Sequence, residues 1–201
     1  MADPADLAWA FGYGSLMWNP GFAHDVFATA RLEGWHRALC VYSWHYRGTH
    51  EAPGLVLGLA EGGECIGRAI GVPRQSEAAM LAYLDEREQT NYVYERLRLP
   101  VTLAGGGVVD AWAYVARTDH PQYAGDLPED EVVRHVLQGV GVGGPCADYV
   151  RNTVAHLREI GIGDHRLEAV VRRLDAVAPL SRPVPPADGS TPSRSAPPAG
   201  A

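Results

Sequence analysis

Residues 7–18 read LAWAFGYGSLMW, an apolar run that two glycines and a serine interrupt before it resumes. The apolar part predicts a strand over Leu7–Tyr13. The glycines allow the backbone after it to approach a bound group closely, and consecutive N–H groups there suit a carboxylate or the oxygen of a tetrahedral intermediate. The alternative is an ordinary glycine-rich strand end, with Tyr13 and Trp18 packed in the core.

Short apolar segments bounded by glycine, proline or charged residues predict five more strands. They span Trp35–Tyr42, Gly54–Leu59, Cys65–Val72, Val93–Val101 and Val108–Val115. The three consecutive glycines at 105–107 predict a hairpin turn between the last two of these strands.

Apolar positions at helical spacing predict four helices, and Ser76 is expected to cap the first of them. They span Glu77–Gln89, Glu129–Val140, Ala147–Ile160 and Asp164–Leu174. Strands followed mostly by helices indicate an α+β domain, with a curved or closed sheet flanked by helices.

The chain has 201 residues, a length that favours one compact domain with a tail. From residue 177 onward the sequence is rich in proline, serine, alanine and glycine and lacks aromatic residues. Such a segment cannot bury enough apolar area to offset the entropy of ordering. We therefore expect a folded domain over residues 7–176 and a disordered tail over residues 177–201.

The formal net charge of −7 provides no broad basic surface, which disfavours nucleic acid and anionic membranes as partners. The first six residues, MADPAD, carry acids where a secretory signal would carry lysine or arginine. No apolar run approaches the roughly 18 residues that a membrane span needs. We expect a cytoplasmic protein, a monomer or weak dimer, that acts on a small molecule.

Cysteine and histidine spacing predicts no metal centre. Cys40, Cys65 and Cys146 are widely spaced without a CxxC pair, so buried reduced thiols are expected. The eight histidines show no HExxH or comparable ligand spacing, and no GxSxG elbow is present. We therefore expect neither a metal nor a cofactor, and no sequence pattern supports covalent catalysis.

Glu88 is the leading candidate for an acid/base group. On an ideal helix Leu81, Leu84 and Glu88 share one side, which directs this carboxylate toward the core. A carboxyl held partly out of water has a raised pKa, which suits proton transfer near neutral pH. If the helix ended near Arg87, Glu88 would instead be solvated. Glu95 is a rival, because strand alternation places it with Val93, Leu97 and Leu99.

Two residues outside this helix are candidate substrate contacts. Arg47 follows a predicted strand and precedes a glycine, where its guanidinium could bind a carboxylate through two parallel hydrogen bonds. Tyr123 lies in a turn-rich loop, where its phenol could contact a ligand. A surface salt bridge and simple packing are the respective alternatives.

Five segments together resemble the ChaC family of γ-glutamylcyclotransferases in content and in order. They are FGYGSLMW at 11–18, YRGT at 46–49, PGLVLGL at 53–59, YLDERE at 83–88 and DHPQY at 119–123. The resemblance covers about residues 8–175. It implies a small mixed β-barrel with flanking helices, no cofactor, and glutathione as substrate, cleaved to 5-oxoproline and cysteinylglycine.

The resemblance also implies roles for particular residues. The backbone of Tyr13, Gly14, Ser15 and Leu16 would bind the γ-glutamyl group, and the catalytic glutamate would be Glu88. Two alternatives stay open, namely a cyclotransferase for other γ-glutamyl amines or dipeptides and a non-catalytic module that binds a γ-glutamyl compound.

Overall fold

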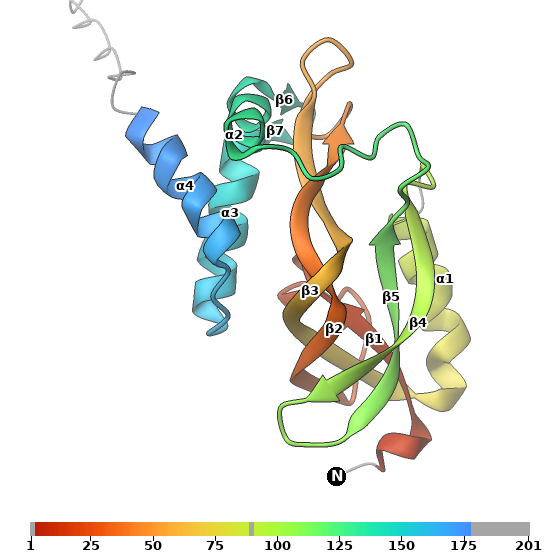
Figure 1. Ribbon diagram of the computed structural model, residues 1–201. Coiled ribbons are helices and arrows are strands. Elements are labelled where there is room, and N and C mark those ends of the chain that lie inside the picture. The colour runs from red at the N-terminus through yellow and green to blue at the C-terminus, as the bar shows by residue number, and fades with distance from the viewer. Residues whose placement is uncertain (1–2, 89–90, 178–201) are drawn as a thin grey trace, which may run out of the picture.

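The computed structural model describes residues 3–88 and 91–177, and a closed β-barrel forms the centre of this part (Figure 1). The strand order around the barrel is β1-β3-β2-β4-β5. Neighbouring strands are antiparallel except β1 and β5, which close the barrel in parallel. The strands span Leu7–Gly12 (β1), Val26–Ser43 (β2), Gly54–Pro73 (β3), Tyr94–Leu103 (β4) and Val108–Ala116 (β5). The predicted closed sheet is confirmed.

The strands β2 and β3 are longer than predicted because glycines bend them without ending them. Gly62 and Gly63 have φ angles of 94° and 72°, and they carry β3 through a segment that reads as a turn in the sequence. Opposite them, Gly34 has a φ of 81° beside a register shift in β2. Such irregularities bend paired strands. The prediction of separate strands at 54–59 and 65–72 was therefore wrong.

In the described part of the chain, four α-helices cover two sides of the barrel (Figure 1). One of them, α1, packs on the outer face of β1, β3 and β5, and the other three gather beside β2 and β3. The helices span Glu77–Glu88 (α1), Glu129–Gln138 (α2), Cys146–Glu159 (α3) and His165–Val177 (α4). All four predicted helices are present, although Gln89 lies outside the described residues.

Short elements connect these helices and strands. The 3₁₀ helices are η1 (Pro4–Asp6), η2 (Ser15–Met17) and η3 (Arg74–Ser76), and a small ribbon pairs β6 (Val140–Gly141) with β7 (Gly144–Pro145). Ser76 ends η3, which runs directly into α1. The predicted tail, apart from Val177 at the end of α4, lies outside the described residues.

Side chains of β1 alternate between two apolar layers. Leu7, Trp9 and Phe11 join the main core, which includes side chains of the barrel strands and of the helices α2 to α4. Ala8 and Ala10 face the second layer, which packs against α1. Alternation along a strand sends successive side chains to opposite faces, and here both faces are covered. This is why the segment before the glycines is apolar at every position.

The loop that joins β2 to β3 folds back onto the β6–β7 ribbon. The amides of Val142 and Gly143 donate to the carbonyl oxygens of His45 and Tyr46, at 3.0 and 2.9 Å. Arg47 Nη1 donates in return to the carbonyl oxygen of Gly143. The loop is therefore held from both sides.

The first part of β3, residues 54–60, pairs with β2 alone, whereas β1 pairs only with residues 68–73. The other edge of residues 54–60 is covered by side chains instead of a strand. Leu55 N–H donates to Cys146 Sγ at 3.3 Å, and the same thiol donates to the Leu55 carbonyl at 3.1 Å.

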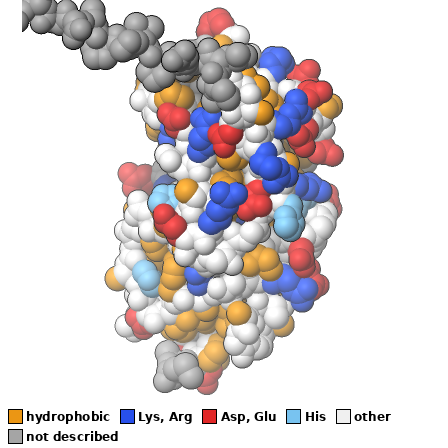
Figure 2. Space-filling view, turned by 90° about the vertical axis from the view of Figure 1, so that its left-hand side faces the viewer, with side chains coloured by type: hydrophobic (Ala, Val, Ile, Leu, Met, Phe, Trp, Pro, Cys, Tyr) orange, Lys and Arg blue, Asp and Glu red, His pale blue; other side chains and the backbone are white. Residues whose placement is uncertain are grey.

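The face covered by α3 and α4 carries acidic and basic side chains close together (Figure 2). Arg151 pairs with Asp175 at 2.9 Å and Arg158 with Glu168 at 3.2 Å, and both pairs link the two helices. Exposed pairs of this kind add little stability. No field of one sign dominates this face. Among the described helices, none is both long and apolar enough to cross a membrane.

Candidate active site

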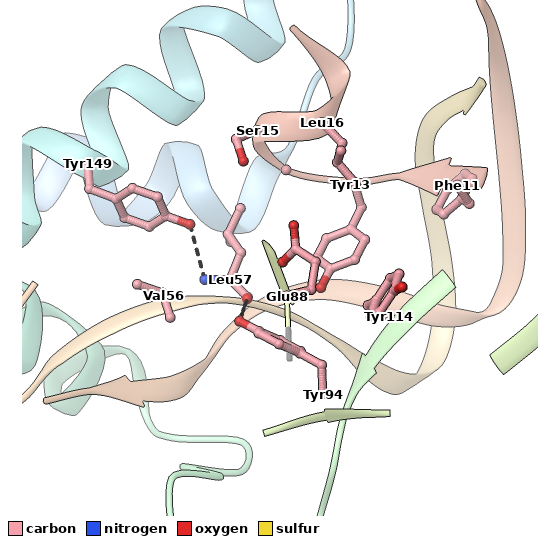
Figure 3. Close-up of a pocket in the computed structure, with 11 residues that line it drawn as sticks. Phe11, Tyr13, Ser15, Leu16, Val56, Leu57, Glu88, Tyr94, Tyr114 and Tyr149 are labelled. Carbon is pink, nitrogen blue, oxygen red and sulfur yellow. Dashed lines mark hydrogen bonds between the residues drawn. The ribbon is translucent and has the colours of Figure 1, made fainter. Parts of the chain in front are cut away.

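A pocket lies where the end of β1, the η2 segment and the end of α1 meet the edge of β3 (Figure 3). It contains about 490 Å³ of space, part of it open to solvent. Its lining comes from β1, η2, β3, α1, β4, β5 and α3: Phe11, Tyr13, Gly14, Ser15, Leu16, Val56, Leu57, Glu88, Tyr94, Tyr114 and Tyr149. Segments distant in sequence thus form one cavity.

Glu88 enters this pocket from α1. Met80 and Leu84 are buried beneath the helix, and Glu88 follows Leu84 by one helical turn, so its carboxylate turns inward beside Tyr13 (Figure 3). Its side chain is 22% exposed. Burial raises the pKa of Glu88, while the nearby guanidinium of Arg87, with Nε 3.1 Å from Oε1, acts in the opposite direction. The helical periodicity predicted this inward orientation.

The segment after β1 lines the same pocket and carries backbone N–H donors. Met17 N–H donates to the Gly14 carbonyl at 2.9 Å, and Asn19 N–H donates to the Ser15 carbonyl at 2.8 Å. Within the described part of the chain, the N–H groups of Gly14, Ser15 and Leu16 have no protein acceptor. We call these three N–H groups the amide nest. Free neighbouring amides attract negative charge.

Tyrosine hydroxyls satisfy the edge of β3 at Leu57. Tyr94 donates to the Leu57 carbonyl at 2.7 Å, and the Tyr149 hydroxyl accepts from Leu57 N–H at 3.2 Å (Figure 3). Burial raises the pKa of the Tyr13 and Tyr94 hydroxyls well above their ordinary range. These phenols therefore stay neutral, and they add no negative charge near Glu88.

The structure brings together Glu88 and all four predicted residues from Tyr13 to Leu16, but two other predicted contacts lie outside the pocket lining. The guanidinium of Arg47 lies over the ring of Tyr149, 5.3 Å from its centroid, and Tyr149 in turn lines the pocket. The backbone of Tyr123 forms an isolated antiparallel β-bridge with Val41 of β2. Their assignment as substrate contacts stays a prediction.

The rival carboxylate Glu95 is exposed near the start of β4 and does not line the pocket. Alternation grouped Glu95 with Val93, Leu97 and Leu99, but Glu95 is exposed although Val93 is buried. The structure therefore favours Glu88 over Glu95 on position alone.

Arg87 belongs to the site although the sequence pattern placed it at the flank of the apolar stripe. Its Nη2 donates to Ser15 Oγ at 2.6 Å and its Nη1 donates to the Asn19 carbonyl at 2.9 Å. Together with the pair to Glu88, these bonds join the end of α1 to the segment that carries the amide nest. The sequence feature that could have identified Arg87 as a site residue is its position directly before Glu88.

A second hollow adjoins the pocket and shares Val56, Glu88 and Tyr94 with it. Its lining includes the polar side chains of Asn91 and Gln122, which are hydrogen-bonded to each other at 2.6 Å. The carboxylate of Glu88 therefore stands at the junction of two cavities.

The thiols offer no rival nucleophile. All three cysteines are free and buried, as predicted, and burial raises their pKa to about 12 for Cys40 and about 11 for Cys65 and Cys146. A thiol with so high a pKa is almost wholly protonated near neutral pH. Among the described residues, no group of three or more potential metal ligands occurs.

Comparison with known proteins gives concordant matches. A family model described as "ChaC-like protein" matches residues 8–177. The glutathione-specific gamma-glutamylcyclotransferase of Escherichia coli is 33% identical over 159 residues, which are 79% of this chain and 69% of that protein. Glutathione-specific gamma-glutamylcyclotransferase 1 of Homo sapiens is 30% identical over 187 residues, 90% of this chain and 84% of that protein.

A solved structure shows the same fold. The crystal structure of the yeast gamma-glutamyl cyclotransferase specific to glutathione superposes with a TM-score of 0.74 at 20% identity. The match covers 85% of this chain and 99% of that one.

Proposed function

This chain belongs to the ChaC-like family, and on that premise we propose that it cleaves glutathione into 5-oxoproline and cysteinylglycine. One structural observation supports the proposal independently of family membership. The Glu88 carboxylate, with a pKa raised by burial, faces the Tyr13–Leu16 segment across one pocket. A proton-transfer group and a set of free donors thus meet at the place where a scissile amide would lie.

The reaction needs no nucleophile from the protein. The α-amine of the γ-glutamyl group attacks its own γ-carbonyl carbon, forms the new C–N bond of a five-membered lactam, and leaves a tetrahedral oxyanion. Well-oriented intramolecular attack reaches effective molarities of about 10⁵–10⁸ M. The C–N bond to cysteine then breaks, and cysteinylglycine leaves with its nitrogen protonated.

Glu88 and the amide nest divide the remaining tasks. As a base, Glu88 removes a proton from the substrate ammonium, and as an acid it returns one to the departing amine. The N–H groups of Gly14, Ser15 and Leu16 stabilise the oxyanion, a role in which the loss of one donor costs about 10²–10³ in turnover. The hollow beside Glu88 is where we place the cysteinylglycine portion.

Incubation of the purified protein with glutathione tests the proposal, with 5-oxoproline and cysteinylglycine quantified by mass spectrometry. We expect both products in equal amounts, and slower release of 5-oxoproline from γ-glutamyl dipeptides other than glutathione. Faster turnover of those dipeptides would assign a different γ-glutamyl substrate. Saturable binding of glutathione without any product would identify a binding module instead.

Replacement of Arg87 by methionine should move the acid limb of the pH profile. The Arg87 cation holds the pKa of Glu88 below the value that burial alone would produce. Without this cation the pKa of Glu88 rises further. The decrease in kcat/KM on the acid side should therefore have its midpoint at a higher pH than in the wild type. Measurement of kcat/KM against pH reports this ionisation in the free enzyme.

The control is Arg74→Met, because Arg74 lies before α1 and its side chain donates to the carbonyls of Ala5 and Leu7, away from Glu88. This variant should keep the wild-type midpoint. An Arg87→Met profile with an unmoved midpoint would show that Glu88 is not the titrating base.

For the setting of the reaction, we infer a cytoplasmic enzyme that works as a monomer or weak dimer. Arg47 and Tyr123 are retained as proposed substrate contacts.

A further inference from the structure

A buried arginine lies directly behind the amide nest. The whole of Arg37 is 4% exposed, and its guanidinium is enclosed by β1, β3, η2 and the start of α4. Arg37 Nε donates to the Tyr13 carbonyl at 2.5 Å, and Nη2 donates to the Ile66 carbonyl at 2.8 Å. Nη2 also lies 3.8 Å from Met17 Sδ. One side chain therefore holds both ends of the segment that carries the nest.

Asp164 fixes this guanidinium from a distant part of the chain. Its Oδ2 accepts from Arg37 Nη1 at 2.9 Å, and the carboxylate is only 12% exposed. Its Oδ1 accepts from Leu167 N–H at 3.1 Å, which caps the first turn of α4. The carboxylate thus binds the helix with one oxygen and Arg37 with the other.

Because the peptide unit is rigid, the contact between Arg37 and the Tyr13 carbonyl also fixes the orientation of one N–H group of the nest. The carbonyl of Tyr13 and the N–H of Gly14 belong to one planar trans unit, in which the C=O and N–H bonds point in opposite directions. When Arg37 holds the oxygen on the far side, the Gly14 N–H is directed to the pocket side. A cation on the carbonyl also polarises the unit, which makes its N–H a stronger donor.

Stability alone does not account for this pair. An ion pair taken out of water gains little over well-packed apolar side chains of similar volume, because desolvation offsets the Coulomb attraction. The contacts of Arg37 converge instead on the nest segment. Resting on the proposed function, we propose that Arg37, held by Asp164, is a positioning residue that orients the amide nest toward the oxyanion.

The test compares Arg37→Met with Arg68→Met. Arg68 is a matched control, because it is half-buried and joins Thr29 to the carbonyl at the end of α3, at 2.9 and 3.3 Å, without touching the nest. We expect Arg37→Met to lower kcat for 5-oxoproline release about 10²-fold, as loss of an oxyanion donor does, whereas Arg68→Met keeps the wild-type kcat. Asp164→Asn, which retains a capping oxygen, should lower kcat in the same direction.

Two further readouts separate positioning from a loss of folded protein. Glutathione binding is measured by calorimetry in the Glu88→Gln background. We expect one binding site per chain, and the double variant Glu88→Gln/Arg37→Met should have a Kd within about threefold of that of Glu88→Gln. The reason is that the nest acts mainly in the transition state. The ¹⁵N–¹H resonance of Gly14 should shift in Arg37→Met and stay in place in Arg68→Met.

Three results would overturn the inference. They are an Arg37→Met kcat within about threefold of wild type, a binding stoichiometry that falls in step with kcat, or an unmoved Gly14 resonance. If Arg37→Met does not fold, Arg37→Lys is the deciding variant, because a single ammonium group cannot bind both the Tyr13 carbonyl and Asp164. A wild-type kcat in Arg37→Lys would then contradict the positioning role. If the wild type itself forms no 5-oxoproline, the proposed function fails, and the Gly14 resonance alone decides the positioning role.

Discussion

Replacement of Glu88 by glutamine should give a folded protein that releases 5-oxoproline from glutathione about 10²–10⁴ times more slowly than the wild type, the usual contribution of a general acid–base group. Glutamine keeps the size and the hydrogen-bonding capacity of the side chain but cannot accept or return a proton. Product release by mass spectrometry and folding by circular dichroism measure the two parts of this expectation.

Two matched variants control for the loss of a carboxylate. Glu86 lies on the exposed side of the same helix, and Glu95 is exposed on β4. Glu86→Gln and Glu95→Gln should both retain turnover. Normal activity in Glu88→Gln together with loss in Glu95→Gln would reverse the assignment.

The same substitution should stabilise the fold near neutral pH. Because burial raises the folded-state pKa of Glu88 above its unfolded value, stability conferred by the protonated carboxyl is complete below the unfolded pKa of about 4.3 and is lost as the pH rises through the folded pKa. Glu88→Gln should therefore melt at a higher temperature than the wild type at neutral pH. The two melting temperatures should converge at acid pH.

Replacement of Gly54 by alanine should destabilise the protein by about 3 kcal/mol or more. A methyl group at this position would overlap the backbone carbonyl of Arg47 and lie 3.1 Å from Cys146 Cβ. Relief requires movement of the β2–β3 loop away from the start of β3. Urea unfolding monitored by tryptophan fluorescence measures the change in free energy.

Gly105→Ala is the control for this measurement. A methyl group there meets no described atom within 4 Å, so the free energy of unfolding should stay within about 0.5 kcal/mol of the wild type. A Gly54→Ala variant of equal stability would mean that the loop does not pack on β3 in solution.

The parts of the fold that local pattern determines were predictable. Helical spacing in α1 and the glycines after β1 are short-range features, and they located Glu88 and the Tyr13–Leu16 segment that meet in the pocket. The bend of β3 was missed, because Gly62 and Gly63 beside two glutamates also fit a turn, and only pairing with β2 decides between them.

The rest of the site depends on contacts between distant segments. Tyr94 and Tyr149 reach Leu57 across 37 and 92 residues of sequence, and Arg37 reaches Asp164 across 127. No periodicity reports such pairs. The pattern also could not decide that Arg87 turns toward Ser15, because this depends on where η2 lies relative to α1.

The unpaired edge of β3 at residues 54–60 has a consequence for how the protein behaves in a crowded solution. A bare strand edge is a template for association with other chains, and proteins generally shield such edges. Here the shield consists of a thiol and a phenol from α3, together with a phenol from β4. Release of α3 would therefore do more than open the cavity, since it would uncover a surface prone to aggregation. Tyr94 and Tyr149, which line the pocket, therefore also protect the chain from association through this edge.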